Sequence, residues 1–530
     1  MTWQETAAQY RASRDGQIPK DLLVKSLPSE SVLDVSTFPT QPGILSPLDL
    51  EITQTLTVVE LVEAIAKGTY SAVQVTEAFC HRAIVAHQLT NCLTEVFFDK
   101  AIQTAKSLDE YYAKTGKTIG PLQSTTCAPD GKKAGHNAVL ADILLKQGAV
   151  LYCRTNMSQG LWFGEGHNNL FGRTTNPFNR NVTCGGSSGG EGALVGLRGS
   201  LLGVGSDLGG SVRIPAAYQG LYGLRGSYSR VPYCKASNSS EGQEIVRSVL
   251  GPLTASVDGL KLFYKSVLDA KPWDMDPWTP RIPWSEERFN LSDHGDGGKL
   301  CFAIMWDDGV VKPVPPYLRA MEETKEALIA AGHEVIDWIP FKSAECVEIL
   351  TAIYNSDGGY DIEKQIGLSG EPRLGHTLDR SAKELSTHEL FDLTFRRTNF
   401  IKTALDHWTA TASRTSTGRP VDGIIVPVAG CAPHPHDAPM YLGYTGFCNL
   451  MDYSASVFPV AKVDPEVDIK EDRKEFMSSD DERTWKEYDP ELQRGAPCSL
   501  QVVGMRYEEE AVIRMTEIVD AAIKTKRAKA

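Results

Sequence analysis

The chain carries the run Gly185-Gly186-Ser187-Ser188-Gly189-Gly190-Glu191-Gly192, followed shortly by Gly203-Val204-Gly205-Ser206-Asp207-Leu208-Gly209-Gly210-Ser211-Val212-Arg213-Ile214-Pro215. Eleven of the 27 residues from Gly185 to Ser211 are glycine, and this density lets the main chain adopt positive φ and approach a ligand closely. The leucine, valine, aspartate and arginine residues between the glycines exclude a flexible low-complexity tract. We therefore expect the backbone of this segment to act on a ligand directly.

A serine closes the second glycine cluster. Consecutive N–H groups beside a serine can converge on the oxyanion that forms when its hydroxyl attacks a carbonyl carbon. We therefore predict Ser211 as the nucleophile and the amides of Leu208, Gly209 and Gly210 as the oxyanion hole. A single cluster of glycine and serine is more often a tight turn between helix and sheet, but two paired clusters favour the catalytic interpretation.

Nucleotide-binding motifs do not account for these glycines. In a G-x-G-x-x-G pattern that begins at Gly203, the third glycine position holds Leu208. The segment Gly116-Lys117-Thr118 resembles the end of a phosphate-binding loop, but Tyr111 stands where that loop requires a glycine. We expect no nucleotide cofactor.

The nucleophile elbow of α/β-hydrolases is a closer alternative. Its G-x-S-x-G pattern is matched twice, centred on Ser187 and on Ser188. That class needs a strand directly before the serine, whereas residues 174–181 are rich in turn formers. An esterase with this fold therefore stays a rival hypothesis.

A possible metal site lies in the segment Cys431-Ala432-Pro433-His434-Pro435-His436-Asp437. Its spacing matches no zinc pattern, and prolines between the potential ligands oppose a common ligating face. We interpret the segment as a loop at the rim of a pocket. The sequence therefore predicts no metal, and serine chemistry needs no flavin or other cofactor.

Composition points to a globular protein with a small-molecule partner. The chain of 530 residues is 42% hydrophobic and 23% charged, with a net charge of -13. An acidic surface repels nucleic acid and anionic lipid, and no apolar stretch is long enough to span a bilayer.

Because the 11 cysteines form no C-x-x-C pair and no signal peptide is recognisable, we expect a reducing, cytoplasmic location. The sequence does not decide whether the protein forms a homo-oligomer.

Hydrophobic periodicity predicts an α/β fold in one domain of residues 1–530. Within it, residues 1–118 read as a helical lead-in and 119–265 as the core that holds the glycine clusters. Residues 271–298 and 468–494 read as surface excursions. Helices and apolar runs alternate after residue 300, which predicts a large mixed, mostly parallel sheet covered by helices on both faces. The expected elements are helices at 58–66, 71–84, 101–114, 137–146 and 317–331, and strands at 149–152, 300–304, 334–339 and 424–428.

With both clusters in view, the chain resembles the amidase signature family, serine hydrolases that cleave carboxamides, and most closely its fungal acetamidase-like branch. In that family one serine attacks the amide, a second serine with a cis peptide bond relays protons, and a lysine is the base. By motif position the resemblance assigns Ser211 as nucleophile and Ser187 as relay. Asp207 and Arg213 match the positions that hold the loop in shape. Further matches are the segments 79–89, 91–95, 169–174, 444–449, 495–497 and 503–504.

The family lysine has no counterpart at its expected place. The family continues from Gly-Pro-Leu into His-Gly-x-Pro, an apolar strand and Lys-Asp, but here Gly120-Pro121-Leu122 is followed by the polar segment 123–134. Lys132 and Lys133 are the nearest substitutes, and a solvated loop lysine stays protonated. The general base is therefore unknown, and a serine without a base is a weak nucleophile.

The function expected from the sequence is hydrolysis of the C–N bond of small carboxamides by a serine nucleophile. The missing lysine leaves two explanations open, an incomplete gene model or a catalytically dead, amidase-like protein that binds an amide. The α/β-hydrolase-type esterase is the third possibility. The expected partner is a small-molecule amide substrate, with neither nucleic acid nor membrane.

Overall fold

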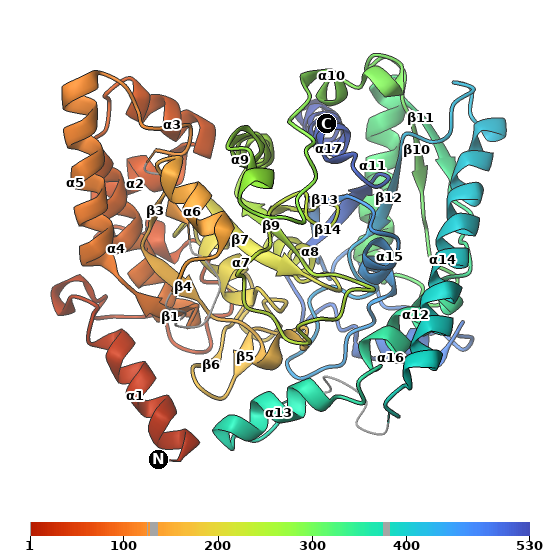
Figure 1. Cartoon of the computed structure of the whole chain (residues 1–530), viewed down its shortest axis with the longest axis horizontal. Coiled ribbons are helices and arrows are strands. Elements are labelled where there is room, and N and C mark those ends of the chain that lie inside the picture. Colours follow the sequence, from red (N-terminus) through yellow and green to blue (C-terminus); the bar gives the residue numbers. More distant parts are fainter. Residues whose placement is uncertain (1, 124–125, 128–135, 375–381, 530) are drawn as a thin grey trace.

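The computed structural model describes residues 2–123, 126–127, 136–374 and 382–529 (Figure 1). The N-terminal part is helical, as expected, with one strand that the sequence did not indicate. That strand, β1 (Leu93–Val96), pairs antiparallel with β4 (Cys153–Thr155). The helices are α1 (Trp3–Asp15), α2 (Pro47–Leu50), α3 (Val58–Ala66), α4 (Ala72–Thr90) and α5 (Phe98–Thr115).

Local sequence signals set the ends of these helices. Thr57 and Ser71 cap α3 and α4 in reciprocal capping boxes with Glu60 and Gln74. At the other end of α5, Gly116 adopts a left-handed conformation with φ of 65°, which glycine takes without steric cost. The predicted helices 58–66 and 101–114 are therefore found with nearly the expected bounds.

An eight-stranded sheet forms the centre of the fold, in the order β11-β10-β12-β14-β13-β8-β9-β7. The α/β fold class with a large mixed sheet is confirmed, but the expectation of mostly parallel strands is wrong. Only the pairs β10–β11 and β10–β12 are parallel, and the other five are antiparallel. The strands are β7 (Leu202–Asp207), β8 (Tyr222–Arg225), β9 (Val249–Thr254), β10 (Cys301–Ile304), β11 (Glu334–Asp337), β12 (Gly423–Pro427), β13 (Ala455–Lys462) and β14 (Pro497–Val503).

This error comes from extending one part of the sheet to the whole. The strands predicted from the alternation after residue 300 are β10, β11 and β12, and these are parallel neighbours. The strands that the sequence did not indicate, β7, β8, β9, β13 and β14, pair in antiparallel ladders. Strand direction depends on the connections, which hydrophobicity does not encode.

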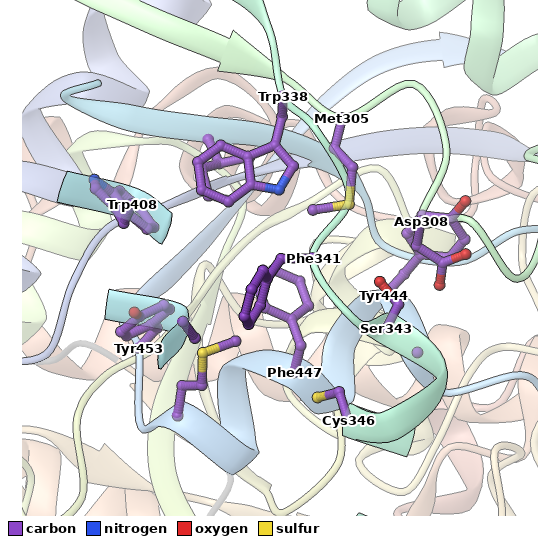
Figure 2. Close-up of a pocket in the computed structure, with 14 residues that line it drawn as sticks. Met305, Asp308, Trp338, Phe341, Ser343, Cys346, Trp408, Tyr444, Phe447 and Tyr453 are labelled. Atoms are coloured by element: carbon purple, nitrogen blue, oxygen red, sulfur yellow. The ribbon is translucent and has the colours of Figure 1, made fainter. Parts of the chain in front are cut away.

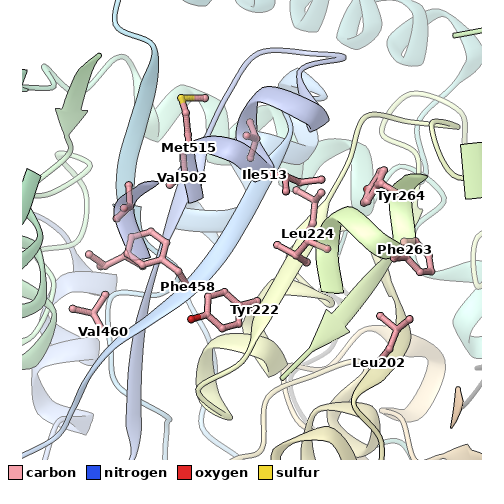
Figure 3. Close-up of a cluster of buried hydrophobic side chains, with 14 of the residues drawn as sticks. Leu202, Tyr222, Leu224, Phe263, Tyr264, Phe458, Val460, Val502, Ile513 and Met515 are labelled. Carbon is pink, nitrogen blue, oxygen red and sulfur yellow. The ribbon is translucent and has the colours of Figure 1, made fainter. Parts of the chain in front are cut away.

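Helices cover the two faces of this sheet in separate groups. On one face, side chains of α9, α11 and α17 pack against Leu224, Phe458 and Val502 (Figure 3). On the other face, α8 packs around Val457, and α15 contacts Ala455. The remaining helices are α6 (Val139–Lys146), α7 (Gly189–Gly196), α8 (Arg213–Tyr218), α9 (Asp258–Asp269), α10 (Glu286–Phe289), α11 (Pro315–Ala330), α12 (Ser343–Tyr354), α13 (Tyr360–Ser369), α14 (Thr387–Ala410), α15 (Gly443–Met451), α16 (Ser479–Glu487) and α17 (Glu509–Lys529).

Short two-stranded ladders complete the structure. Of the apolar run predicted as a strand at 149–152, only β3 (Val150–Leu151) is a strand, and β4 begins directly after the run, at Cys153. β3 pairs in parallel with β2 (Thr126–Cys127), and β5 (His167–Asn168) pairs antiparallel with β6 (Gly172–Arg173). No helix of the described residues combines the length and apolar character that crossing a bilayer requires.

Candidate active site

The two glycine clusters lie side by side, as the paired motif predicts. The first cluster runs into α7, which begins at Gly189, and the second runs from β7 through a loop into α8. The Ser206 N–H donates to Ser188 Oγ at 3.2 Å, and the Gln219 amide donates to the Cys184 carbonyl at 3.0 Å. A Cβ added at Gly185 would lie 2.8 Å from Cα of Pro215, so the backbones approach as closely as glycine permits.

Asp207 organises the loop that follows β7. Its Oδ1 accepts the Gly210 N–H at 2.8 Å, and its Oδ2 accepts the Val212 N–H at 3.3 Å. The Arg213 guanidinium donates to both oxygens, at 3.0 and 3.1 Å. The carboxylate therefore ties together both ends of the segment that contains Ser211.

This ion pair is completely buried, with both side chains 0% exposed. Burial alone would raise the pKa of the Asp207 carboxyl, but Arg213 and the Asn449 amide outweigh this effect and hold the pKa below its ordinary value. Further contacts satisfy Arg213, which donates to the Thr445 carbonyl at 3.0 Å and to Gln501 Oε1 at 3.1 Å. A buried charge pair of this kind keeps its geometry only because its hydrogen bonds are complete.

The amides of the predicted oxyanion hole differ in their availability. The N–H groups of Leu208, Gly209 and Ser211 have no acceptor among the residues that the structure describes. The Gly210 N–H is already bound to Asp207. Within the described part of the chain, three amides beside the Ser211 hydroxyl thus have no acceptor and can donate to a ligand.

The carbonyl groups of the same loop are held from the opposite side. Tyr354 donates its hydroxyl to the Leu208 carbonyl, and Thr445 Oγ1 donates to the Gly209 carbonyl at 2.6 Å. Gly210 has φ of +128°, and a Cβ there would lie 2.7 Å from Thr445 Oγ1. Fixing the carbonyls also fixes the planes of the peptide groups, and hence the directions of their N–H groups.

The peptide bond between Gly186 and Ser187 is cis, which is the conformation that the family resemblance implies for the relay serine. Ser187 is 2% exposed, and its carbonyl accepts the Ser158 N–H at 3.2 Å. A Cβ at Gly186 would lie 2.5 Å from the Glu165 nitrogen and the Phe163 carbonyl oxygen. The local chain is therefore packed tightly on residues 163–165.

No general base emerges from the described residues. Within them, no lysine ammonium donates a hydrogen bond to Ser187 or Ser211. Lys132 and Lys133, the substitutes considered from the sequence, lie outside the described residues. The base stays unassigned.

The potential metal ligands of the segment 431–437 do not converge, because each contacts a different partner. Cys431 Sγ accepts from Gln493 at 3.5 Å, His434 contacts Glu487 at 3.0 Å, and His436 contacts Glu165. A different group, Glu165, His167 and Asp437, has potential ligand atoms within 4.8 Å of one another. Arg173 forms ion pairs with both carboxylates, at 3.1 and 2.6 Å, so one guanidinium already offsets part of the negative charge of this cluster.

Two cavities of the structure are lined by neither serine. One, of about 40 Å³, lies between β10, β12 and the helices α12, α14 and α15 and is walled by aromatic side chains (Figure 2). It has room for no more than a few water molecules. The other, of about 360 Å³, has Asn449 in its wall, and the Asn449 amide donates to Asp207 Oδ1 at 2.9 Å.

Sequence reasoning did not identify the residues that support the loop from a distance. Asn449, Gln501 and Thr445 all bond to Asp207 or Arg213, although they follow the glycine clusters by more than 200 residues. The matched segment 444–449 was the one available signal, since it contains two of the three. Beside this loop, Trp162 packs edge-on against Tyr354 with ring centroids 5.1 Å apart.

Comparison with known proteins is consistent with this geometry. The family model named Amidase matches residues 74–124 and 123–513. The acetamidase of Emericella nidulans is 41% identical over 543 aligned positions, with 98% of each chain covered. The acetamidase of Aspergillus oryzae is 38% identical, also with 98% of each chain covered. The solved structure of a fatty acid amide hydrolase superposes with a TM-score of 0.91 at 31% identity, covering 98% of this chain and 95% of that one.

The alignment with the Emericella nidulans protein is longer than the part of this chain that it covers. Since 98% of 530 residues is about 519, roughly two dozen of the 543 positions aligned with the Emericella nidulans protein have no counterpart here. The two matches of the family model meet at residues 123 and 124, directly after Leu122. On the strength of these matches across nearly its whole length, the chain belongs to the amidase family, as its glycine-rich signature implies.

Proposed function

We propose that this protein is an amidase of the serine type, which hydrolyses the C–N bond of small carboxamides. The observation that carries the proposal is the loop from Asp207 to Arg213, where three free amides adjoin the Ser211 hydroxyl. An amide carbonyl is a poor electrophile, and donors held in place for its developing negative charge lower the barrier to attack. The names of the relatives suggest small aliphatic amides such as acetamide as substrates.

In the proposed reaction, Ser211 Oγ attacks the carbonyl carbon and a tetrahedral oxyanion forms. The amides of Leu208, Gly209 and Ser211 donate to this oxyanion. The hydroxyl proton passes through Ser187 to the leaving nitrogen, the C–N bond breaks, and ammonia or an amine departs. Water then attacks the acyl-serine ester, which releases a carboxylic acid and returns the proton to Ser211.

Asp207 and Arg213 have a supporting part in this mechanism. Neither side chain is exposed, so neither touches the substrate in the proposal. Their part is to hold the Gly210 and Val212 amides, and so to fix the loop between them before the substrate arrives. Such preorganisation avoids a reorganisation cost during the reaction.

We also propose that this chain is nearly inactive because it lacks the family's lysine and the strand that bears it. Two observations support this view, the meeting of the family matches at residues 123 and 124 and the gap of roughly two dozen positions against the relatives. Loss of one member of a catalytic triad costs on the order of 10⁴-fold or more in rate. The alternative function is thus an amide-binding protein without turnover.

The decisive experiment restores the missing segment. The residues that the Emericella nidulans acetamidase has at the gap are inserted after Leu122, and ammonia release from acetamide is compared with that of the original chain. We expect a gain on the order of 10³-fold or more. No gain from a folded insertion variant, or equal activity of the original chain, refutes the proposal that the gap removes the base. Sequencing the transcript across Leu122 and Gln123 tells whether the gap exists in the cell.

A second experiment tests the nucleophile. A fluorophosphonate probe is expected to label the insertion variant at Ser211, with labelling lost in Ser211→Ala and retained in a matched control, Ser413→Ala, at an exposed site. Labelling at Ser187 or Ser188 instead favours the α/β-hydrolase-type esterase. Absence of labelling together with tight binding of an amide favours the binding protein.

A further inference from the structure

A cavity of about 360 Å³ opens between α14, α15 and the segment before β9. Its wall combines apolar and charged side chains and contains three arginines, from parts of the chain that lie far apart in the sequence. Glu244 and Arg506 in the wall are exposed, so solvent reaches it. The lining residues are Tyr228, Glu244, Ile245, Arg247, Arg397, Ile401, Asn449, Met451, Asp452 and Arg506.

Of these arginines, Arg397 has the fewest hydrogen-bond acceptors. Its Nε donates to the Leu450 carbonyl at 3.0 Å, but its two terminal nitrogens have no acceptor within the described ranges. The neighbouring Arg396 differs, because it points to the surface and forms a bidentate pair with Glu348 at 2.7 and 3.2 Å. Arg397 thus presents a partly buried guanidinium to the cavity, and no carboxylate of the described residues forms a hydrogen bond with it.

The acidic residues of the wall already have partners. Asp452 accepts from Arg225 at 2.8 Å and from Arg506 at 2.7 Å. Glu244 accepts from Arg247 at 2.8 Å. Three arginines and two carboxylates line the cavity, and the buried Arg225 adds a fourth guanidinium behind it.

This surplus of positive charge acts on Arg397 itself. Burial lowers the pKa of Arg397, Asp452 opposes that shift, and Arg506, Arg225 and Arg247 lower the pKa further. A bound anion would relieve the repulsion among these guanidinium groups. The planar fork of arginine fits the two oxygens of a carboxylate.

We propose that this cavity is a binding site for a small carboxylate, which Arg397 and Arg506 hold. Asn449 lies in the cavity wall and also bonds to Asp207, so the site is separated from the Ser211 loop by one side chain. The inference does not depend on catalysis at Ser211. Phosphate oxygens accept hydrogen bonds from arginine in a similar way, so the affinities of the two anions must be compared.

The test uses the full chain and titrates sodium succinate, sodium acetate, sodium phosphate and sodium chloride at equal ionic strength. Isothermal titration calorimetry measures affinity, and thermal unfolding measures stabilisation, which rises with occupancy of the folded state. We expect succinate or acetate to bind and raise the melting temperature above the chloride control. Equal effects of all four salts overturn the proposal, and tighter binding of phosphate than of either carboxylate overturns the assignment of the ligand.

Variants locate the site. Arg397→Gln is expected to weaken carboxylate binding roughly ten- to a hundredfold, the effect of losing a charge-assisted hydrogen bond. Its matched control, Arg396→Gln on the same helix, is expected to leave binding unchanged. Arg506→Gln, at an exposed side chain that folding tolerates, provides a second measure and is also expected to weaken binding. Undiminished binding in Arg506→Gln and in folded Arg397→Gln overturns the proposal.

Discussion

The Asn449 amide donates to Asp207 Oδ1 at 2.9 Å, although 242 residues separate the two in the chain. The Asn449 side-chain oxygen also accepts from Arg213 at 2.7 Å. One side chain on α15 therefore completes the hydrogen bonds of both members of the buried ion pair. The Ser211 loop is held in this way by a part of the chain outside the glycine-rich motif.

Breaking the buried pair should be costly. Arg213→Ala leaves Asp207 buried and without its counter-ion, and we expect the free energy of unfolding to fall by about 3–5 kcal/mol. Urea denaturation followed by tryptophan fluorescence measures the change. Arg494→Ala, at a solvent-exposed surface pair, serves as the control and should resemble the original chain. A loss for Arg213→Ala below about 1 kcal/mol would contradict the structural importance of the pair.

A side chain at Gly210 should distort the oxyanion loop. In Gly210→Ala the new Cβ meets Thr445 Oγ1 and Ile214 at 2.7 Å, with φ at +128°. We expect a loss of about 1–3 kcal/mol from the backbone conformation alone, together with slower labelling by a fluorophosphonate in the insertion variant. Gly367→Ala, in α13 with open space around the new Cβ, is expected to retain or gain stability. Equal behaviour of the two variants would show that the loop tolerates a Cβ.

Glu191 should be required as a hydrogen-bond acceptor beside β7. Its carboxylate accepts the Val204 N–H at 3.1 Å and the Thr155 hydroxyl at 2.7 Å, and it is 1% exposed. Glu191→Ala leaves two buried donors without acceptors, at a cost of about 1–3 kcal/mol each. Glu191→Gln keeps one acceptor oxygen and is expected to lose less. Amide hydrogen exchange at Val204 measures the local effect, and equal protection in both variants would be evidence against this role.

His87 should make stability depend on pH. Burial lowers the pKa of His87 to about 3, and Arg14 contributes to the shift. The neutral ring is required because Nδ1 accepts the Leu93 N–H at 3.1 Å. Between the unfolded value of about 6.5 and pH 3, the unfolded chain binds a proton that the folded chain does not. The free energy of unfolding therefore falls as the pH falls through this range.

The free energy of unfolding is expected to fall by about 1.4 kcal/mol for each pH unit below the unfolded pKa of His87. Between pH 7 and pH 5 this amounts to about 2 kcal/mol. Urea denaturation at the two pH values is compared for the original chain, His87→Gln and His388→Gln. His87→Gln should lose this part of the pH dependence, whereas His388→Gln, at an exposed position, should keep it. The same dependence in all three proteins would exclude His87 as its source.

Much of the local structure follows from short stretches of sequence. The helices α3 and α5 have nearly the predicted bounds because their capping residues and apolar spacing act within one or two turns. The segment of β7, the Ser211 loop and α8 was recognisable for a similar reason. Its glycines permit backbone conformations that other residues exclude, so the motif carries its own geometry.

Relationships between distant segments were not predictable in the same way. The mostly parallel sheet was expected because helices and apolar runs alternate after residue 300, and only the pairing of β12, β13 and β14 revealed the antiparallel order. The grouping of Arg397 with Arg506 around one cavity had no local signal either. Each of these depends on which surfaces meet after the chain has collapsed.

The residues alone were sufficient to recognise the amidase signature, to nominate Ser211 and Ser187, and to notice the break after Leu122, because each rests on residue identity at short range. The folded chain was needed to show that Asn449, Thr445 and Gln501 complete the bonds of Asp207 and Arg213. A buried charge requires partners from whichever elements surround it, and packing selects those elements across hundreds of residues.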